Sequence, residues 1–285
     1  MVIPETKFSG NGSGITVIAH FFRSLSSPIS SKPKAFDDHF GFNWGIAAEF
    51  FQNRVNFGSG WHIGLITGDP GVGKTSTLRV FADSLNPSLY KVMYFPMSSG
   101  TTMDFYRGLA FSLGEQPKFR KVELFFQIQN AITDLYDKRR ITPVFILDEM
   151  QSASAQFLHD LSIIFNFDMD KRNPFILILT GLPTLANRLA LNQNRSLDQR
   201  LVTRFHFSPL TPDEVRDYIK HRFKHAGVSR NLINENAYEA ISSSTGGYPR
   251  LVGNLVTQCL IFAFQKQRDL IDEEIVFAAS AEAGI

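Results

Sequence analysis

The sequence predicts an α/β fold, in which a parallel sheet lies between two layers of helices, followed by an all-helical C-terminal domain. Four short apolar runs recur before Phe207, and segments with a helical pattern separate them. Runs that do not alternate with polar residues are typical of strands buried on both faces, as in a parallel sheet covered by helices. After Phe207 only helical patterns remain. The sequence therefore predicts a three-layer core and a separate helical domain.

The predicted strands span residues 61–67, 91–95, 144–147 and 175–179. A helix with apolar residues from Ile46 to Val55 precedes the first strand and is expected to pack on the core. Two apolar stripes between the strands indicate helices that face the core. They consist of Val122, Phe125, Phe126, Ile132 and Leu135, and of Phe157, Leu158, Leu161, Ile164 and Phe165. This helical spacing favours core packing over a base-stacking surface as the role of the phenylalanines.

Helix start signals predict the C-terminal domain. Residues 211–214 form a capping box with Pro212 at the first helical position, and Leu210 and Val215 can form a hydrophobic staple. Further helices are expected at residues 235–242, 249–265 and 272–281. We divide the chain into a flexible N-terminal extension (1–35), an α/β core (36–208) and a helical lid (209–285).

Composition excludes some classes of protein. The chain has 285 residues, of which 44% are hydrophobic, so it can bury one large core and a smaller second one. Its net charge of +2 is compatible with a local nucleic-acid contact but does not indicate one. Cys259 is the only cysteine, which excludes an intrachain disulfide and a zinc site of several thiolates. No apolar run reaches the roughly 18–20 residues of a membrane span and no secretory signal is evident, so we expect a cytoplasmic protein without membrane contact.

A phosphate-binding loop follows the first predicted strand and precedes a helix. Residues 68–75 match the pattern GxxxxGK[ST] without a mismatch. In this pattern the glycines let backbone N–H groups surround the phosphates, Lys74 reaches the β- and γ-phosphates, and Thr75 ligates Mg²⁺. An ordinary glycine turn is the alternative, but the strand-loop-helix context favours nucleotide. The expected binding residues are Gly68, Asp69, Pro70, Gly71, Val72, Gly73, Lys74, Thr75 and Ser76.

Two carboxylates follow the third predicted strand, which we expect to lie beside the phosphate loop. Asp148 is suited to hold Mg²⁺, directly or through water, and Glu149 to accept a proton from the attacking water or to orient it. A solvated turn is the alternative.

Thr180, after the fourth strand, could sense the γ-phosphate or position the water, although a hydroxyl is also an ordinary strand terminator. Arg250, in the first turn of a C-terminal helix, could bind a phosphate oxygen.

These motifs occur in an order that resembles the AAA+ ATPases, in particular the ExeA-type branch that includes the transposition helpers TniB and TnsC. The matching segments read GDPGVGKTS, VFILDEMQ, FILILTG, RSLDQRLVTRFHFSPLTPDEVRDYI and GGYPRLVGNLV. The resemblance covers roughly residues 60–283. Relatives usually show DEAQ where this chain has Asp148-Glu149-Met150-Gln151, a change that leaves both carboxylates intact. The extension of residues 1–35 has no counterpart, so the contacts to adenine stay unassigned.

The resemblance implies a role for each site residue. Lys74 and Thr75 would belong to the first nucleotide motif, and Asp148 and Glu149 to the second. Thr180 would be the first sensor and Arg250 the second, on the lid. An arginine donated by a neighbouring subunit would complete the site, and Arg200 or Arg204 lies at the matching place, with Arg200 slightly favoured. The alternative for either arginine is an ion pair with Asp198 or Asp213 at a helix end.

The resemblance also implies functions. The first is a homo-oligomeric, magnesium-dependent ATPase that assembles on double-stranded DNA and regulates or recruits a transposase. Basic clusters at residues 118–121, 138–140, 171–172 and 220–224 could contact DNA phosphates, although such clusters are often solvated helix ends. The second is an ExeA-like ATPase for secretion or envelope assembly, which we expect less because the chain ends at Ile285, soon after the lid. The third is a generic protein-remodelling ATPase, for which no pore loop is evident.

Overall fold

The computed structural model describes residues 63–96, 101–168, 171–228 and 230–285. The predicted extension of residues 1–35 and the predicted helix from Ile46 to Val55 lie outside these residues. The chain divides into two compact units, one of which ends at Ser208, while the other includes Pro209–Ile285. None of the helices in the described ranges is long and apolar enough to cross a bilayer.

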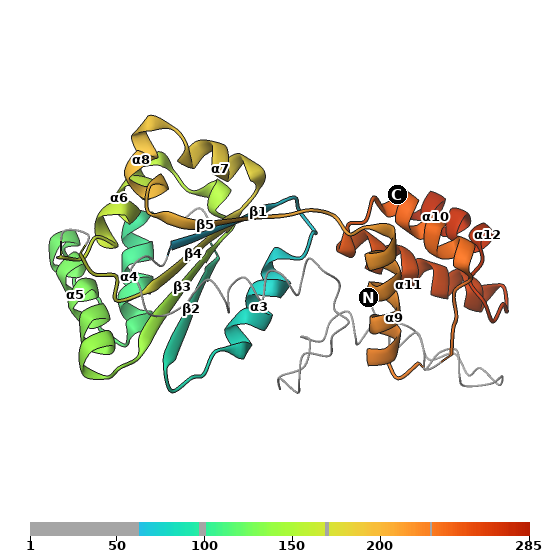
Figure 1. Ribbon diagram of the computed structural model, residues 1–285, viewed down its shortest axis with the longest axis horizontal. Helices are drawn as coiled ribbons and strands as arrows, with labels where there is room; N and C mark the ends of the chain where they lie inside the picture. Colours follow the sequence, from blue (N-terminus) through green and yellow to red (C-terminus); the bar gives the residue numbers. More distant parts are fainter. Residues whose placement is uncertain (1–62, 97–100, 169–170, 229) are drawn as a thin grey trace. The chain divides into compact units, whose positions relative to one another are not determined.

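The first unit is built on a five-stranded sheet with the strand order β2-β3-β4-β1-β5 (Figure 1). The strands are β1 (Ile63–Gly68), β2 (Tyr90–Pro96), β3 (Thr142–Asp148), β4 (Ile176–Gly181) and β5 (Leu201–Phe207). All neighbouring pairs are parallel. The carboxyl ends of all five strands therefore lie at one edge of the sheet, where ligands bind in open α/β sheets.

The four apolar runs correspond to β1 through β4, so the predicted α/β class and its parallel sheet are confirmed. β5 is not among the strands that these runs predict. Its inner residues alternate between exposed and half-buried, and only its ends, Leu201 and Phe207, are buried. β5 therefore lacks the continuous apolar run by which β1 to β4 were identified.

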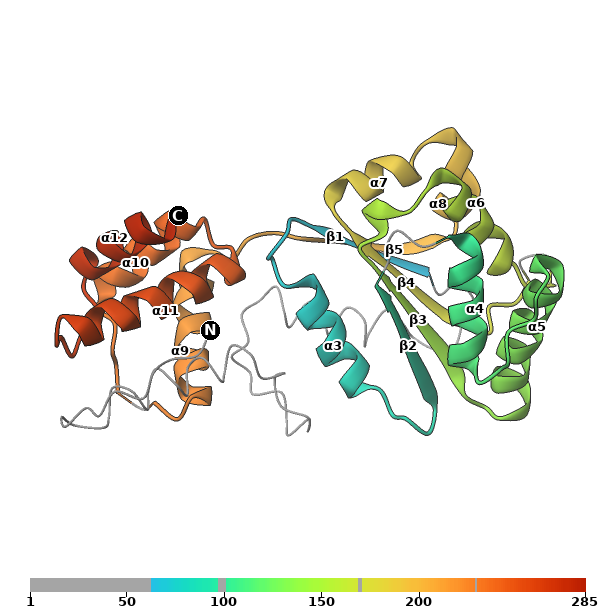
Figure 2. The same ribbon diagram turned by 180° about the vertical axis from the view of Figure 1, so that it is seen from behind.

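Helices cover both faces of the sheet (Figures 1 and 2). One face carries α4 (Thr102–Leu113), α5 (Lys121–Thr133), α6 (Ala155–Ile164), α7 (Pro183–Leu189) and α8 (Arg195–Asp198). Leu65, Phe145 and Leu177 belong to the same buried cluster as these helices. The other face carries α3 (Lys74–Ser84), and the alternate residues Ile66, Ile146 and Ile178 are each only 1% exposed. Both faces of β1, β3 and β4 are therefore buried, as their apolar runs predict, whereas in β2 only Met93 is buried.

The structure confirms one of the two predicted apolar stripes and only part of the other. All five residues of the stripe in α6 and its C-cap are buried, as predicted. In α5 the prediction was partly wrong, because Val122 and Phe126 are 66% and 56% exposed. The buried face of α5 runs instead through Leu124, Ile128 and Ile132. Four apolar residues crowd into positions 122–126, so the pattern allows two faces, and only packing decides between them.

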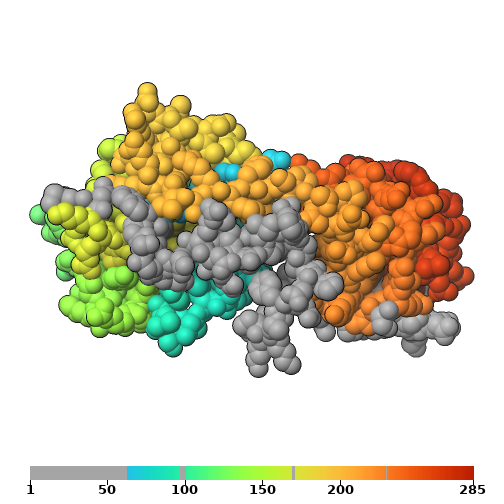
Figure 3. Space-filling view, in the orientation of Figure 1, coloured from blue at the N-terminus to red at the C-terminus, as the bar shows by residue number. Residues whose placement is uncertain are grey.

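Short helices also occur in the described part of this unit. They are η1 (Asp134–Lys138), which is a π-helix, η2 (Met150–Ser152) and η4 (Asn192–Asn194). In the space-filling view the residues of α7, η4 and α8, in yellow, form the upper surface of this unit (Figure 3). η2 directly follows the carboxylates at the end of β3 and is therefore part of the site's surroundings.

In the part of the second unit that the structure describes, residues 209–228 and 230–285, the elements are helices, as predicted. Its helices are α9 (Pro212–His225), α10 (Glu235–Thr245), α11 (Pro249–Gln265) and α12 (Glu273–Ala283). The capping box of α9 is present, with Thr211 accepting a hydrogen bond from the Glu214 N–H and Glu214 accepting one from the Thr211 N–H. Gly247 fixes the start of α11 against the start of α9, because its carbonyl accepts a hydrogen bond from the Leu210 N–H at 2.9 Å.

Candidate functional site

The phosphate loop lies between β1 and α3 and has the backbone that its glycines allow. Gly71 and Gly73 have φ angles of 84° and 104°, in the left-handed region that other residues rarely adopt. Gly68 has no room for a side chain, because a Cβ there would lie 2.8 Å from the Cβ of Phe207. The loop therefore passes directly into α3, whose first N–H groups have no partners within the helix and can bind an anion.

Lys74 is the first residue of α3 and is only 7% exposed. Its Nζ donates hydrogen bonds to the carbonyl oxygens of Gly68, at 2.7 Å, and of Asp69, at 2.9 Å. A buried ammonium group held by loop carbonyls places a positive charge inside the loop before any phosphate arrives. Contact of Lys74 with the β- and γ-phosphates, the role expected from the sequence pattern, stays a prediction.

The Asp148 carboxylate, at the end of β3, is 1% exposed and accepts four hydrogen bonds. The Thr180 hydroxyl (2.5 Å) and the Glu149 N–H (2.9 Å) donate to Oδ1. The hydroxyls of Thr75 (2.8 Å) and Tyr94 (3.0 Å) donate to Oδ2. Burial alone would raise the pKa of Asp148, but these donors stabilise the charged form and hold its pKa below the ordinary value. The carboxylate is therefore ionised and fixed in place.

The sheet brings these groups together in a way that differs from the prediction in one respect. β3 does not neighbour β1, since β4 lies between them. Thr180, the next-to-last residue of β4, fills this intermediate position and contacts Asp148, while Thr75 reaches Asp148 from the first turn of α3. The structure thus brings together Lys74, Thr75, Asp148, Glu149 and Thr180 at the carboxyl edge of the sheet.

The oxygen atoms of Thr75 and Asp148 suit Mg²⁺, which prefers hard oxygen ligands and keeps much of its water. Within the described ranges there is no group of three or more His, Cys, Asp or Glu side chains that could hold a metal ion. A magnesium ion at this edge would therefore draw most of its ligands from water and from phosphate oxygens. The donor set fits that mode of binding.

Tyr94 is a site residue that sequence reasoning missed. It lies in β2, pairs with Ile146 of β3, and its hydroxyl shares Oδ2 of Asp148 with Thr75. Burial and the neighbouring Asp148 charge raise the pKa of Tyr94 to about 12, so it is a hydrogen-bond donor at neutral pH. In the sequence Tyr94 is one residue of an apolar run, and only the pairing of β2 with β3 brings it to Asp148.

Glu149 has a left-handed backbone, with φ 58° and ψ 34°, and an exposed side chain. This conformation is uncommon for a residue other than glycine and costs of the order of 1 kcal/mol. The Glu149 carboxylate accepts a hydrogen bond from the side-chain amide of Gln151 in η2. An exposed carboxylate directly after the buried Asp148 can meet a water molecule, as a general base requires.

The predicted trans arginines lie in different environments. Arg200 is 8% exposed, and its guanidinium donates a hydrogen bond to the Ser162 carbonyl of α6 at 2.6 Å. Arg204 is half-exposed in β5 and forms an ion pair with Asp198 at 2.8 Å, the pairing named as the alternative for these arginines. Arg250 belongs to the second unit, where it is exposed in the first turn of α11. Contacts of these arginines with nucleotide stay predictions.

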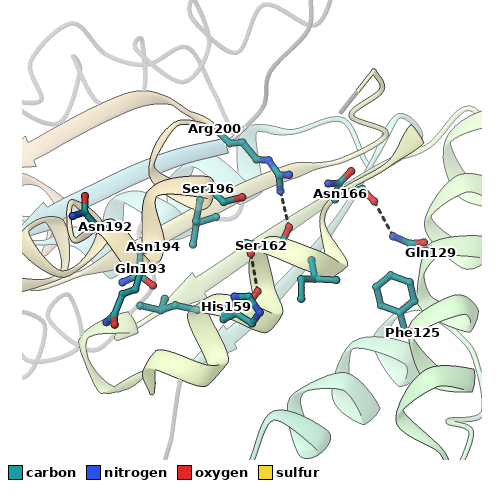
Figure 4. A pocket seen from close by; sticks show the side chains of 13 residues that line it. Phe125, Gln129, His159, Ser162, Asn166, Asn192, Gln193, Asn194, Ser196 and Arg200 are labelled. Carbon is teal, nitrogen blue, oxygen red and sulfur yellow. Dashed lines mark hydrogen bonds between the residues drawn. The ribbon is translucent and has the colours of Figure 1, made fainter. Parts of the chain in front are cut away.

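Arg200 also lines a cavity of about 610 Å³ between α5, α6 and the η4–α8 segment (Figure 4). Asn192, Gln193 and Ser196 lie on one side of it and Phe125 and Gln129 on the other, with the Arg200 guanidinium directed at Ser162. None of the lining residues belongs to the phosphate loop or to the Asp148-Glu149 pair. The cavity is therefore distinct from the carboxyl-edge site.

Parts of this chain are similar to known proteins. Residues 59–189 match the family model described as AAA domain. General secretion pathway protein A from Aeromonas hydrophila is 26% identical over 270 residues, which cover 93% of this chain and 48% of that protein. The chain thus spans about half the length of this relative.

Solved structures share the fold over most of the chain. The crystal structure of Cdc6p from Pyrobaculum aerophilum matches with a TM-score of 0.66 and 20% identity, covering 88% of this chain and 70% of that one. The structure of Drosophila ORC bound to DNA matches with a TM-score of 0.68 and 13% identity, covering 100% of this chain and 70% of that one. At these identities the likeness shows a common fold.

Proposed function

We propose that this chain, which carries an AAA+ ATPase domain, uses the carboxyl edge of its sheet to bind and hydrolyse MgATP and passes the nucleotide state on to a larger assembly. One observation carries the assignment of the site: a single buried carboxylate, Asp148, is hydrogen-bonded to Thr75 of the phosphate loop and to Thr180 of β4. Glu149, the residue next to it, is exposed. These parts supply a metal-holding group, a phosphate-sensing hydroxyl and a base at one place.

The chemistry follows from these positions. Lys74 would stabilise the β- and γ-phosphate oxygens, while Thr75 and Asp148 would hold the magnesium ion that neutralises the developing charge. Glu149 would accept a proton from water as the water oxygen bonds to the γ-phosphorus atom. The bond from that phosphorus to the bridging oxygen of ADP breaks in the same displacement, which leaves ADP and inorganic phosphate. Thr180 would orient the γ-phosphate or the water through its position beside Asp148.

The relative favours a role in assembling a secretion or envelope complex. General secretion pathway protein A aligns with 93% of this chain, and no solved structure named above shares as much sequence identity. Because the chain spans 48% of that relative, the match supports a common ATPase part and leaves the assembled complex a proposal. In this function, ATP binding promotes contact with other subunits or with a partner protein, and hydrolysis reverses it.

The second candidate is the DNA-linked transposition helper implied by the resemblance to TniB and TnsC. The likeness to an ORC structure bound to DNA supports a DNA contact, and the four basic clusters would supply phosphate ligands. Three clusters contain a cation already engaged with a carboxylate, namely Lys121 with Asp160, Lys138 with Asp134 and Arg172 with Asp137. Because exposed ion pairs of this kind are weak, they do not exclude DNA contact; we place this candidate second because the relative that aligns with 93% of this chain is a general secretion pathway protein.

ATP turnover measured with and without duplex DNA separates the candidates. In the secretion-type function, turnover does not respond to DNA, and the chain does not bind DNA when loaded with a non-hydrolysable ATP analogue. In the DNA-linked function, DNA binds in the analogue state, stimulates turnover, and dissociates steeply as salt rises. The Lys74→Ala variant serves as the control, because any DNA contact that depends on ATP must be lost with it.

A further inference from the structure

Gln151 connects the proposed base to the strand that would sense the γ-phosphate. It is the middle residue of η2, two positions after Glu149. Its side-chain nitrogen donates a hydrogen bond to Oε2 of Glu149, and its side-chain oxygen accepts one from the Leu182 N–H at 3.1 Å. Leu182 follows β4 directly. Both ends of one amide group are therefore used, one on each side of the site.

The space for this contact is built into the end of β4. A Cβ at Gly181 would lie 2.8 Å from Oε1 of Gln151 and 3.3 Å from its backbone nitrogen, so the glycine lets the Gln151 amide approach the strand. Arg188 of α7 holds the same turn, because its guanidinium donates to the carbonyls of Gln151 at 2.8 Å and of Ala153 at 2.5 Å. The turn that carries Gln151 is thus fixed to α7 as well as to β4.

A second contact ties the same two strand ends together. β3 and β4 are neighbours, with Leu147 paired to Leu179, and the Thr180 hydroxyl donates to Asp148 one step further along. Residues 180–182 therefore contact both carboxylates, Asp148 through Thr180 and Glu149 through Gln151. A displacement of this segment toward a bound phosphate would move both contacts.

The hydrogen bond from Gln151 restricts the position of the Glu149 carboxylate. The backbone of Glu149 is in the left-handed region and its side chain is exposed, so little packing restricts the carboxylate. A charge-assisted hydrogen bond from an amide is directional and fixes one carboxylate oxygen. With Oε2 engaged by Gln151, Oε1 is the atom that can take the proton from water.

We infer that Gln151 is a positioning residue that sets the Glu149 carboxylate for proton transfer and makes its position depend on the 180–182 segment of β4. This inference rests on the proposed role of Glu149 as the base. It accounts for why a glycine stands at position 181 and why Arg188 clamps the η2 turn. Gln151 itself neither takes a proton nor contacts the nucleotide in this account.

The test compares Gln151→Ala, Gln151→Glu and Gly181→Ala with a control, Gln193→Ala, whose side chain is exposed in η4. Gln151→Glu keeps the shape of the side chain but replaces the donor nitrogen with an oxygen. We expect kcat to fall at least about tenfold in the first three variants, since a misplaced general base forfeits part of its roughly 10²–10⁴-fold contribution. Affinity for a non-hydrolysable ATP analogue should stay within about twofold, and Gln193→Ala should match the parent chain.

A double-mutant cycle with Glu149→Gln decides whether Gln151 acts through Glu149. If it does, Gln151→Ala causes no further loss of turnover in the Glu149→Gln background. A loss of the same size in both backgrounds, or normal kcat in Gln151→Ala and Gln151→Glu, overturns the inference. If Glu149→Gln alone retains normal turnover, the proposed role of Glu149 fails instead, so the two failures are distinguishable.

Hydrogen exchange supplies a readout that does not depend on turnover. In the nucleotide-free chain, the Leu182 N–H donates a hydrogen bond to Gln151. Hydrogen exchange at the Leu182 amide should therefore be faster in Gln151→Ala than in the parent chain, and it should be unchanged in Gln193→Ala. Unaltered exchange at Leu182 in Gln151→Ala would show that the bridge to β4 does not exist in solution.

Discussion

At the scale of single residues, the buried carboxylate of Asp148 organises the site. Taking a carboxylate out of water is costly unless its lone pairs find donors, and four donors surround this one. The Thr75 hydroxyl donates its proton to Asp148 and keeps its oxygen lone pairs, so it would be able to ligate Mg²⁺, as predicted, while this hydrogen bond is retained. Tyr94, Thr180 and the Glu149 N–H supply the other three hydrogen bonds that hold the carboxylate in place.

Substitutions at Lys74 and Glu149 should separate binding from hydrolysis. Lys74→Ala removes the cation held inside the loop, and we expect it to abolish binding of a fluorescent ATP analogue. Glu149→Gln keeps the shape of the side chain but cannot accept the proton, so binding should persist while turnover falls about 10²–10⁴-fold. Equal loss of binding in both variants would contradict the assigned roles.

Local motifs predicted residues that the structure brings to one edge of the sheet, and they did not predict residues whose place there depends on strand pairing. The phosphate loop and the Asp148-Glu149 pair are recognisable because their spacing along the chain is fixed by the chemistry. Tyr94 and the bridging role of Gln151 depend on the pairing of β2 with β3 and of β3 with β4. The burial of Arg200 against α6 likewise comes from packing between distant segments.

At the scale of elements, local signals succeeded where one short segment decides the outcome. Start signals place α9 and α11 correctly, since capping depends on a few neighbouring residues. β5 and the buried face of α5 could not be predicted from local patterns. An edge strand tolerates polar residues, and a helix with apolar residues on two faces can pack either way until its neighbours are known.

Gly247 and Gly227 form a matched pair for testing the contact between α9 and α11. Both have a φ of 76°, but a Cβ at Gly247 would lie 2.0 Å from the Leu210 carbonyl oxygen, whereas nothing lies within 4 Å of one at Gly227. Gly227→Ala should lose about 1 kcal/mol of stability from backbone strain alone. Gly247→Ala should lose more than about 2 kcal/mol, because the two chain segments must also separate. Urea unfolding followed by circular dichroism measures both, and equal losses would contradict the steric contact.

The N-cap of α12 should give a pH-dependent contribution to stability. The hydrogen bond from the Ile275 N–H has the largest effect on the pKa of Asp272 and, together with Arg268, holds it below its ordinary value of 3.8, although burial acts in the opposite direction. A depressed pKa in the folded chain means that the charged form stabilises the fold above pH 3.8, and that this stabilisation is lost as pH falls through the folded value.

Asp272→Asn keeps the cap but removes the charge, and Asp272→Ala removes both. We expect Asp272→Ala to lose about 1 kcal/mol at pH 7, with a smaller loss in Asp272→Asn. The loss in Asp272→Asn should vanish near pH 2. Unfolding midpoints of the three chains across this pH range provide the measurement, and a loss in Asp272→Asn that is independent of pH would show that the charge does not contribute.

At the scale of the whole molecule, an arginine from a neighbouring subunit would couple hydrolysis to assembly. Arg204 is the better candidate on the structure, because it is half-exposed and its ion pair with Asp198 is a surface pair of the kind worth no more than about 1 kcal/mol. Arg200 would have to leave a buried contact with Ser162. The sequence alone could not decide between Arg200 and Arg204, because both lie in one short segment. Their exposed fractions in the structure differ, and this difference favours Arg204.

Mixing two inactive variants tests this coupling. Lys74→Ala cannot bind ATP but carries an intact Arg204, whereas Arg204→Ala binds ATP but cannot donate the arginine. If the arginine acts between subunits, we expect each variant alone to be inactive and their mixture to regain part of the turnover. The reference is a mixture of Lys74→Ala with Glu149→Gln, which should stay inactive. No recovery in the first mixture would exclude Arg204 from this role.

The most direct measurement is the affinity for ATP with and without Mg²⁺, by calorimetry, in the parent chain and in Thr75→Ala and Asp148→Asn. A site that grips the phosphates with Lys74 and the metal with Thr75 and Asp148 predicts that Mg²⁺ tightens ATP binding in the parent chain and that either substitution abolishes most of this gain. The absence of measurable ATP binding by the parent chain in the presence of Mg²⁺ would contradict the account.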